Sequence, residues 1–491
     1  MFRRYDNEKN HDIIILAGLC LLCNIHKIIH SIFFSEPGCS TPQDLFSLLY
    51  SSAYFAGKDW TAIGREYSAY YGYGFVALFS WLYRLINDGF LIYKVICVCC
   101  NLLVVISCIL CYKILIMFQV TSNKWLLFFF SITIASIQGS SYYAITNEHA
   151  LNVCVWVVLY LLMRLCDAQM SAKKRVRDTL LLGIVLVYSC MVHARAVILY
   201  ALVFLCVAAI KVIGKRMILN IPVIAAAGLL YLPYRYFTDS LQMTLLGEIN
   251  LNSSVAARTS NALAQEFSWE QIWSFFMSIL YYLHELSVIT AGLAIICAAC
   301  IIYVLYSFIM KHSVIEMNAL EKERIICGLI YSICGIGAFI MGMCFTSRGA
   351  IYDGFTKQVN EHLRLLTLVR YFTPFIAPMC LFTIVILLKV QNMERKKILL
   401  ISTVVLCVVQ FLFVYIIFPN IKHTGWAWGV YIPYTWKVEM KKEDVYLIGG
   451  VSTLFYLFFI NFILLRKKNW WEVCAVLLIF NKSCLTDWRM K

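Results

Sequence analysis

The sequence predicts an all-α integral membrane protein with 12 or 13 transmembrane helices, arranged as one polytopic domain over residues 1–491. Two observations carry this prediction. The chain is 62% hydrophobic and only 14% charged, and apolar runs of eighteen or more residues recur along it, which is typical of membrane spans. Its basic residues gather in short loops at every second turn. The net charge of +15 therefore follows from membrane topology, and we expect no nucleic-acid partner.

The basic loops set the orientation of the chain. By the positive-inside rule they are cytoplasmic, and so is the N-terminus. The first apolar run, residues 13–34, is too long for a signal peptide and lacks a small-residue cleavage site, so we take it as the first span. The basic clusters are Arg3, Arg4 and Lys9; Lys173, Lys174, Arg175 and Arg177; Lys211, Lys215 and Arg216; Lys311, Lys322 and Arg324; Arg395, Lys396 and Lys397; and Arg466, Lys467 and Lys468.

With these loops inside, the apolar runs fall on one path through the bilayer. A surface helix is expected at residues 267–283, before the eighth span. No tandem repeat or low-complexity segment interrupts the series, so a single domain is indicated. The predicted spans are 13–34, 90–118, 125–141, 150–165, 179–192, 196–210, 218–234, 286–310, 325–345, 370–388, 398–418 and 445–465, with 470–480 as the thirteenth.

The first outer loop, residues 35–89, is much longer than an ordinary connection between spans. It contains two amphipathic stretches, 45–55 and 73–86, separated by the polar turn Gly57-Lys58-Asp59-Trp60. Amphipathic helices lie in the membrane interface with their apolar side down. We therefore expect two surface helices that hold Asp59 at the outer membrane face.

The 21 cysteines do not indicate a disulfide framework or a metal site. Nearly all of them lie inside apolar runs, where cysteine behaves as a small hydrophobic residue. No two of them have the flanking residues of a zinc site.

The predicted topology places a set of polar and ionisable residues on the outer side. A charge inside hydrocarbon costs about 2.5–3.5 kcal/mol, so such groups usually face a wet cavity or a partner. Each residue alone is equally well explained as an interface residue that reaches water. As a set they favour function, because the positive-inside rule gives no reason to place arginines outside. They are Asp59, Glu148, His149, His193, Arg195, Glu361, His362, Arg364, Arg370 and Tyr371.

These residue types suit one kind of chemistry. A guanidinium is always charged and binds phosphate oxygens in a bidentate way. A carboxylate on an outer loop suits deprotonation of a hydroxyl. Together they indicate group transfer from a lipid-linked donor to an acceptor outside the cytoplasm. The sequence has no glycine-rich nucleotide-phosphate loop, so nucleotide sugars are not expected as direct donors.

Four motifs follow one another on the outer side. The turn at Asp59 precedes Tyr70-Tyr71-Gly72-Tyr73-Gly74; Asn147-Glu148-His149 heads the fourth span; His193-Ala194-Arg195 joins the fifth and sixth; and Val369-Arg370-Tyr371-Phe372-Thr373-Pro374 opens the tenth. Over about residues 1–390 this order resembles the multi-span glycosyltransferases of the C superfamily (GT-C). That superfamily includes protein O-mannosyltransferases, lipid A aminoarabinose transferases and oligosaccharyltransferase catalytic subunits.

The resemblance implies roles for the outer residues. Asp59 is the base on the acceptor hydroxyl, the polyprenyl phosphate is the leaving group, and the anomeric carbon is inverted. Arg195 and Arg370 offset the charge of the phosphate, and Glu148 with His149 orients sugar or acceptor. The predicted donor- and acceptor-binding set is Glu148, His149, His193, Arg195, Arg370, Tyr371, Lys58 and Glu66.

The resemblance also implies the partners and the location. We expect a polyprenyl-phosphate sugar donor and a cell-envelope glycan, lipid or protein as acceptor, with the site facing outside. Since the chain has no appended domain and no clear eukaryotic signal, we also expect a multi-pass protein of a bacterial plasma membrane. The first loop has Lys58-Asp59 where metal-dependent members have an acidic pair, and Glu148 stands alone. We therefore expect no required cofactor, with a divalent cation as the alternative.

Two other functions fit part of the pattern. A secondary transporter also has about twelve spans, but it keeps its site near the membrane midplane and typically has matched halves. A polysaccharide polymerase or ligase shares outer arginines and histidines, with its main outer loop late in the chain. The loop at residues 419–444, which holds Lys422, His423, Trp426, Trp428 and Trp436, keeps that alternative open, although an aromatic interface belt explains it too.

Overall fold

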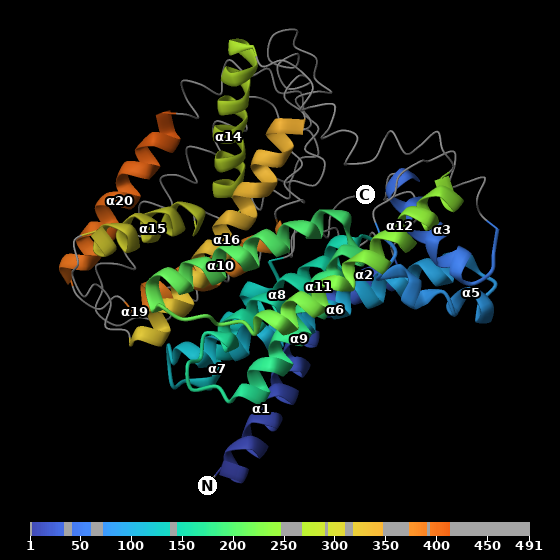
Figure 1. Cartoon of the computed structure of the whole chain (residues 1–491), viewed down its shortest axis with the longest axis horizontal. Helices are drawn as coiled ribbons and strands as arrows, with labels where there is room; N and C mark the ends of the chain where they lie inside the picture. The colour runs from blue at the N-terminus through green and yellow to red at the C-terminus, as the bar shows by residue number, and fades with distance from the viewer. Residues whose placement is uncertain are drawn as a thin grey trace. The chain divides into compact units, whose positions relative to one another are not determined.

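The computed structural model describes residues 2–33, 42–59, 72–137, 145–246, 268–289, 293–309, 318–346, 373–389 and 393–412. Every regular element in these ranges is a helix (Figure 1). Four of the described helices are long and apolar enough to cross a membrane. They are α6 (Gly89–Phe118), α8 (Asn147–Leu165), the continuous stretch of η3 (Ala194–Val197) with α10 (Ile198–Gly214), and α16 (Ala319–Thr346).

The expected first span is broken rather than continuous. It consists of α1 (Phe2–Cys23) and α2 (Ile25–Phe33), which are bent by 49°. Asn24 stands at the break, and its amide donates to the Cys20 carbonyl at 2.9 Å. A polar side chain that bonds back to its own helix competes with the regular ladder and bends the helix. Counted as one span, this pair brings the number among the described residues to five.

The seventh predicted span, 218–234, is also divided. It forms α11 (Ile221–Leu229) and α12 (Tyr231–Leu246). The Asn220 side chain caps α11 by accepting from the Val223 amide at 3.3 Å, as N-cap asparagines do. Pro233 lacks the N–H that would bond the Leu229 carbonyl, which explains why a new helix starts here. Because α12 continues to Leu246, the polar outer loop begins about twelve residues later than expected.

The third span and the later ones are described only in part. The third, expected at 125–141, is observed as α7 (Lys124–Ala135), with Asn123 as its N-cap. The expected surface helix is α14 (Trp269–Ile289), followed by α15 (Leu293–Ile309), α19 (Thr373–Lys389) and α20 (Met393–Leu412). The twelfth and thirteenth predicted spans lie outside the described residues, so the total of 12 or 13 stays a prediction.

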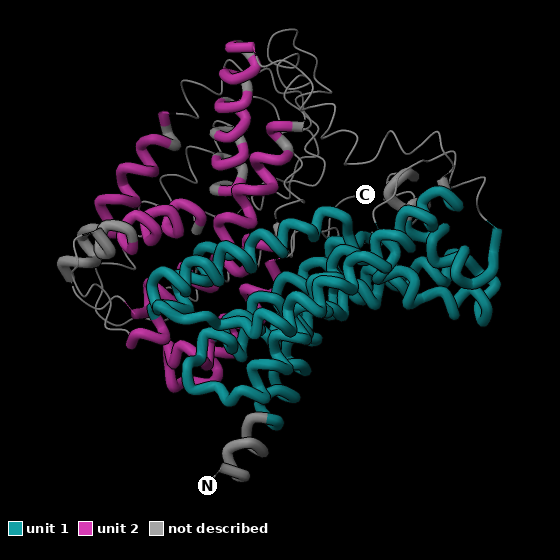
Figure 2. The backbone as a smooth tube through the Cα atoms, in the orientation of Figure 1, with its two compact units in different colours: residues 1–114, 140–264, 322–331 teal, residues 115–139, 265–321, 332–491 magenta. Residues whose placement is uncertain are grey.

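The chain forms two compact units (Figure 2). Unit 1 contains residues 1–114, 140–264 and 322–331, and unit 2 contains 115–139, 265–321 and 332–491. In unit 2, α15 packs against α19 and α20. A Cβ on Gly335 would collide with the Phe375 ring, so this position requires the smallest residue. The expectation of a single polytopic domain stays a prediction.

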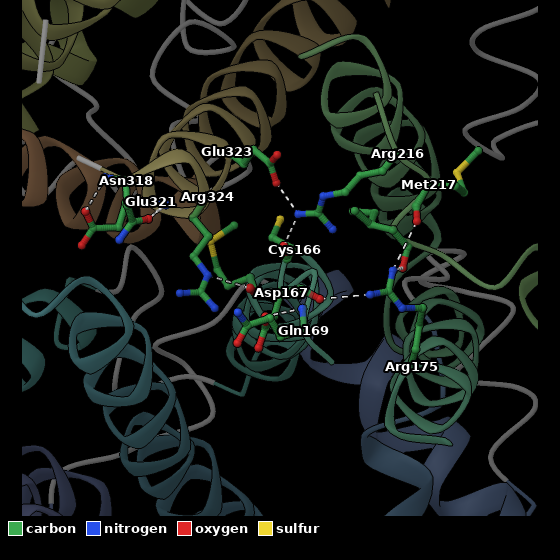
Figure 3. A network of polar contacts seen from close by, with 12 residues as sticks. Cys166, Asp167, Gln169, Arg175, Arg216, Met217, Asn318, Glu321, Glu323 and Arg324 are labelled. Carbon is green, nitrogen blue, oxygen red and sulfur yellow. Dashed lines mark hydrogen bonds and ion pairs between the residues drawn. The ribbon is translucent and has the colours of Figure 1, made fainter. Parts of the chain in front are cut away.

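In unit 1, α8 packs along α9 (Ala172–Val192), and α9 packs on α11. Three arginines donate to carbonyls in the last turn of α8 and just after it (Figure 3). Arg324 donates to the Met163 carbonyl at 3.0 Å, Arg175 donates to the Asp167 carbonyl at 3.0 Å, and Arg216 donates to the Cys166 carbonyl.

The last carbonyls of a helix lack partners within the helix and carry its negative dipole end, so cationic donors suit them well. Arg216 also pairs with Glu323 near the start of α16. A capping box of Asn318 and Glu321 begins that helix, with N–H···O distances of 2.9 and 3.3 Å.

Candidate functional site

The end of the first outer loop is fixed to the end of α9. The amides of Tyr73 and Gly74 both donate to the Met191 carbonyl, at 2.9 and 2.7 Å. Gly72 has φ +125°, and a Cβ on it would collide with the Val192 carbonyl. A Cβ on Gly74 would lie 2.7 Å from the Met191 Cβ. Only glycine combines this backbone conformation with such a close approach, which explains the Gly-Tyr-Gly sequence.

The start of α8 meets the same point. The Asn147 side chain donates through Nδ2 to the Gly72 carbonyl at 3.3 Å, and the Tyr188 hydroxyl of α9 donates to the Gly74 carbonyl at 3.3 Å. Gly72 therefore links the first loop, the residue before Glu148 and the residue before His193. We call residues 72–74, 147–149 and 191–195 the outer junction.

The Asp59 turn follows α3 (Pro42–Phe55). Gly57, at φ +81°, closes a Schellman motif in which the Lys58 amide donates to the Ala53 carbonyl and the Gly57 amide to the Tyr54 carbonyl, both at 2.9 Å. This turn satisfies the last carbonyls of the helix and directs the chain away from it. Lys58 and Asp59 come immediately afterwards and are exposed.

An aromatic cluster connects α3 with the outer junction. The Tyr73 ring lies 5.9 Å from the Phe55 ring and 5.4 Å from the Phe237 ring of α12. Tyr73 is buried with Tyr50, Leu241 and Leu245. Aromatic pairs at such separations contribute about 0.5–1.5 kcal/mol beyond their buried area. Asp59 thus follows a helix whose last residue, Phe55, packs against Tyr73 of the Gly-Tyr-Gly sequence.

The two amphipathic stretches do not form two separate surface helices. The second stretch is divided into η2 (Val76–Phe79) and α5 (Leu82–Leu85). It folds back onto α3, where the Ser52 hydroxyl donates to the Val76 carbonyl at 2.7 Å and the Tyr83 hydroxyl to the Leu49 carbonyl at 3.3 Å. The hydrogen-bonding potential of these buried groups is satisfied between the stretches, which joins them.

One apolar row of the second stretch remains exposed. Leu78, Trp81 and Leu85 are 58%, 55% and 73% exposed. At this spacing they lie on one side of the stretch, and such a row is suited to contact with lipid.

His193 and Arg195 form a local turn at the outer end of α9. The His193 Nδ1 accepts a hydrogen bond from the Arg195 backbone amide at 3.2 Å. A nitrogen that accepts is unprotonated, so the neutral imidazole carries its proton on Nε2. His193 is buried and Arg195 is half-buried. The turn fixes the imidazole and starts η3.

Glu148 and His149 occupy the first turn of α8. Glu148 is half-buried and His149 is 1% exposed. A carboxylate in the first turn of a helix is stabilised by the positive end of the helix dipole. Three of the remaining predicted site residues, Glu66, Arg370 and Tyr371, lie outside the described residues.

The structure brings to this region several residues that were not among the predicted site residues. Asn147 and Tyr188 bond the Gly72 and Gly74 carbonyls, and α12 supplies Phe237. Asn147 was signalled only by its place beside Glu148, while the contribution of α12 had no signal because it depends on tertiary packing.

The part of the chain that the structure describes contains no group of three or more His, Cys, Asp or Glu side chains arranged to hold a metal ion. The expectation that no cofactor is required stays a prediction.

Comparison with known proteins places the fold. No protein-family model matches the sequence, and no curated protein matches it. The structure resembles a solved one, with a TM-score of 0.52 over 96% of this chain and 75% of the other, at 12% identity. This likeness shows a shared fold, and the described part of the chain is all-helical with several long apolar helices, which confirms the all-α membrane fold expected from the sequence. The solved structure is that of ArnT, a lipid A aminoarabinose transferase, from Cupriavidus metallidurans bound to undecaprenyl phosphate.

Proposed function

We propose that the protein is a membrane glycosyltransferase that moves a sugar from a polyprenyl-phosphate donor to an acceptor hydroxyl on the extracytoplasmic face. The observation that carries the proposal is the contact of Gly72 with Asn147 and Val192, because it joins three segments that bear predicted site residues. The fold shared with ArnT, which was solved bound to undecaprenyl phosphate, supports a polyprenyl-phosphate partner.

Asp59 is the proposed base. Its position after the Schellman turn leaves the carboxylate exposed, which suits an acceptor arriving from outside. In the transfer step, the acceptor oxygen bonds to the anomeric carbon while its proton goes to the Asp59 carboxylate. The bond from the anomeric carbon to the phosphate oxygen breaks, and polyprenyl phosphate leaves with the bonding electrons. A positioned base contributes typically about 10²–10⁴-fold to such a step.

Arg195 and Arg370 are the proposed phosphate-binding residues, and Tyr371, Lys58 and Glu66 complete the binding set. In the described part of the site, His193 uses Nδ1 to accept from the Arg195 amide. Its Nε2–H is thereby fixed as a donor, which suits a phosphate or sugar oxygen. This arrangement couples the orientation of the imidazole to the backbone that presents the Arg195 guanidinium.

Glu148 and His149 are proposed to orient the sugar or the acceptor. These two residues directly follow Asn147, whose side-chain nitrogen donates to the Gly72 carbonyl. The transporter and polymerase alternatives gain no support of their own from the described residues, whereas the GT-C-like fold favours transfer. The protein is further proposed to be a multi-pass protein of a bacterial plasma membrane with a cytoplasmic N-terminus.

The test uses the full-length protein in lipid nanodiscs. Undecaprenyl phosphates that carry glucose, mannose, galactose or arabinose are incubated with detergent-extracted envelope glycans, lipids and proteins as acceptors, and release of undecaprenyl phosphate is followed by mass spectrometry. The proposal predicts release with at least one donor that depends on both acceptor and Asp59. Consumption of a nucleotide sugar in place of all lipid-linked donors would contradict it.

A further inference from the structure

One side of α8 carries three buried polar side chains. His149, Asn152 and Trp156 stand at positions i, i+3 and i+7, which places them on one side of a helix. They are 1%, 5% and 0% exposed. With a rise of 1.5 Å per residue, they extend over about 10 Å from the outer junction into the predicted span. We call them the α8 polar row.

Two members of this row lack hydrogen-bond partners. Neither the amide nitrogen nor the amide oxygen of Asn152 has a partner within the described ranges, and the same holds for the Trp156 indole nitrogen. Buried polar groups are almost always hydrogen-bonded, and an unpaired one costs free energy. In a membrane span this cost is not relieved by bulk water. These groups are therefore expected to bind something that the described residues do not supply.

Other buried asparagines of unit 1 behave differently. Asn24 donates to the Cys20 carbonyl at 2.9 Å, and Asn101 donates to the Cys97 carbonyl at 3.1 Å. Both thus bond the carbonyl four residues earlier, which is the local solution for a polar side chain inside a helix. Asn152 does not bond the carbonyl four residues earlier, so within the described ranges both its side-chain nitrogen and its side-chain oxygen stay open to a ligand.

Neighbouring side chains and the first loop bond α8 at several points along its length. The Tyr331 hydroxyl donates to the Val155 carbonyl at 3.0 Å, and Arg324 donates to the Met163 carbonyl at 3.0 Å. The Lys113 ammonium lies 5.7 Å from the centre of the Tyr160 ring. At the other end, Asn147 is bonded to Gly72. The polar atoms of Asn152 and Trp156 are therefore presented in fixed positions.

We propose that Asn152 and Trp156 form a subsite that binds hydroxyl groups of the donor's sugar; this inference rests on the proposed function. A side-chain amide both donates and accepts, as a hydroxyl does, and the indole N–H adds a donor. A phosphate matches this pair poorly, because neither residue is cationic. A polyprenyl tail matches it poorly too, because it has no group to pair with the amide.

The test measures how the full-length protein in nanodiscs distinguishes sugar-bearing from bare lipid. The probes are undecaprenyl phosphate and the same lipid carrying glucose, mannose, galactose or arabinose, and the readout is the ratio of the dissociation constants of bare and sugar-bearing lipid. Asn152→Leu and Trp156→Phe keep the approximate shape and remove the hydrogen-bonding atoms. Each is expected to lower the preference of the wild type for its best sugar by about tenfold, the value of one hydrogen bond, with affinity for bare lipid kept within about twofold.

Asn101→Leu is the matched control. It removes a buried asparagine that has partners, Cys97 and Ser31, so thermal stability is expected to fall while sugar preference stays. Asn152→Leu breaks no hydrogen bond within the described chain, so its thermal stability is expected to stay equal or rise.

Unchanged sugar preference in both Asn152→Leu and Trp156→Phe would overturn the inference and assign the row to buried water. A wild type that binds bare undecaprenyl phosphate and prefers none of the four sugars would overturn it as well, with the proposed phosphate partner intact. Failure to bind undecaprenyl phosphate at all would remove the proposed function and this subsite together.

Discussion

Replacement of Gly72 by alanine tests the outer junction directly. The Cβ would collide with the Val192 carbonyl at a backbone φ of +125°, so the loop has to move off α9. That movement breaks the hydrogen bonds from the Tyr73 and Gly74 amides to Met191 and from Asn147 to Gly72. At about 0.5–1.5 kcal/mol for each of three bonds, the junction loses about 1.5–4.5 kcal/mol.

Hydrogen–deuterium exchange on the full-length protein in nanodiscs measures this loss locally. Protection of the Tyr73 and Gly74 amides is expected to fall by about ten- to a thousandfold in Gly72→Ala, because each 1.4 kcal/mol of local opening changes exchange about tenfold. Transfer activity is expected to fall with it, while α6 and α8 keep their protection.

Gly228→Ala is the matched control, since a Cβ there meets nothing within 4 Å. In a helix interior this change is expected to be neutral or stabilising by up to about 1 kcal/mol. If Gly72→Ala left both protection and activity at wild-type levels, the contact between the first loop and α9 would not organise the site.

Three further predictions concern the base, the cytoplasmic end and the topology. Asp59→Asn is expected to lower turnover at least about a hundredfold with donor affinity largely kept; turnover within a few-fold of wild type would exclude Asp59 as the base. Arg216→Met leaves Glu323 without its ion pair, so the free energy of unfolding is expected to drop by about 1–3 kcal/mol, measured as a lower thermal midpoint. The added change Glu323→Gln should recover part of this loss. An unchanged midpoint in Arg216→Met would show that the pair does not contribute to stability. Single cysteines placed beside Asp59, Glu248 and Lys357 are expected to react with an impermeant reagent from the outer side only, and reaction of all three from the cytoplasm alone would reverse the topology.

The apolar runs predicted the membrane helices best. The second span, expected at 90–118, is α6 at Gly89–Phe118, and the fourth, expected at 150–165, is α8 at Asn147–Leu165. Such helices follow from hydropathy alone because every backbone group inside lipid has to be satisfied within the segment. The same reasoning gave no warning of the breaks at Asn24 and before Tyr231, since these depend on single side chains within otherwise apolar sequence.

The sequence singled out the ionisable residues of the candidate site, but it did not predict how their segments connect. Glu148, His193 and Arg195 stood out as ionisable groups at span ends. Gly72 joins these segments because its backbone has a φ of +125° and Val192 approaches it closely. Neither the backbone angle nor the approach of a distant segment can be read from the sequence. The fold-back of residues 73–86 onto α3 was missed for a similar reason, because an amphipathic pattern is compatible with burial against protein or against lipid.

The basic loops gained a second role in the structure. Arg175, Arg216 and Arg324 were explained by the positive-inside rule alone. The structure shows that each also donates to a carbonyl at the C-terminal end of α8 or just after it. Membrane topology and helix capping both favour basic residues at the cytoplasmic, C-terminal end of a span. The sequence pattern therefore did not distinguish these two roles.

The most direct test of the central claim is an experimental structure of the full-length protein with undecaprenyl phosphate. The account predicts density for the phosphate at the outer junction, within hydrogen-bond distance of the Arg195 guanidinium and with Arg370 directed at the same phosphate. A phosphate bound away from Arg195, with the two guanidiniums pointing into separate lipid-exposed grooves, would contradict it.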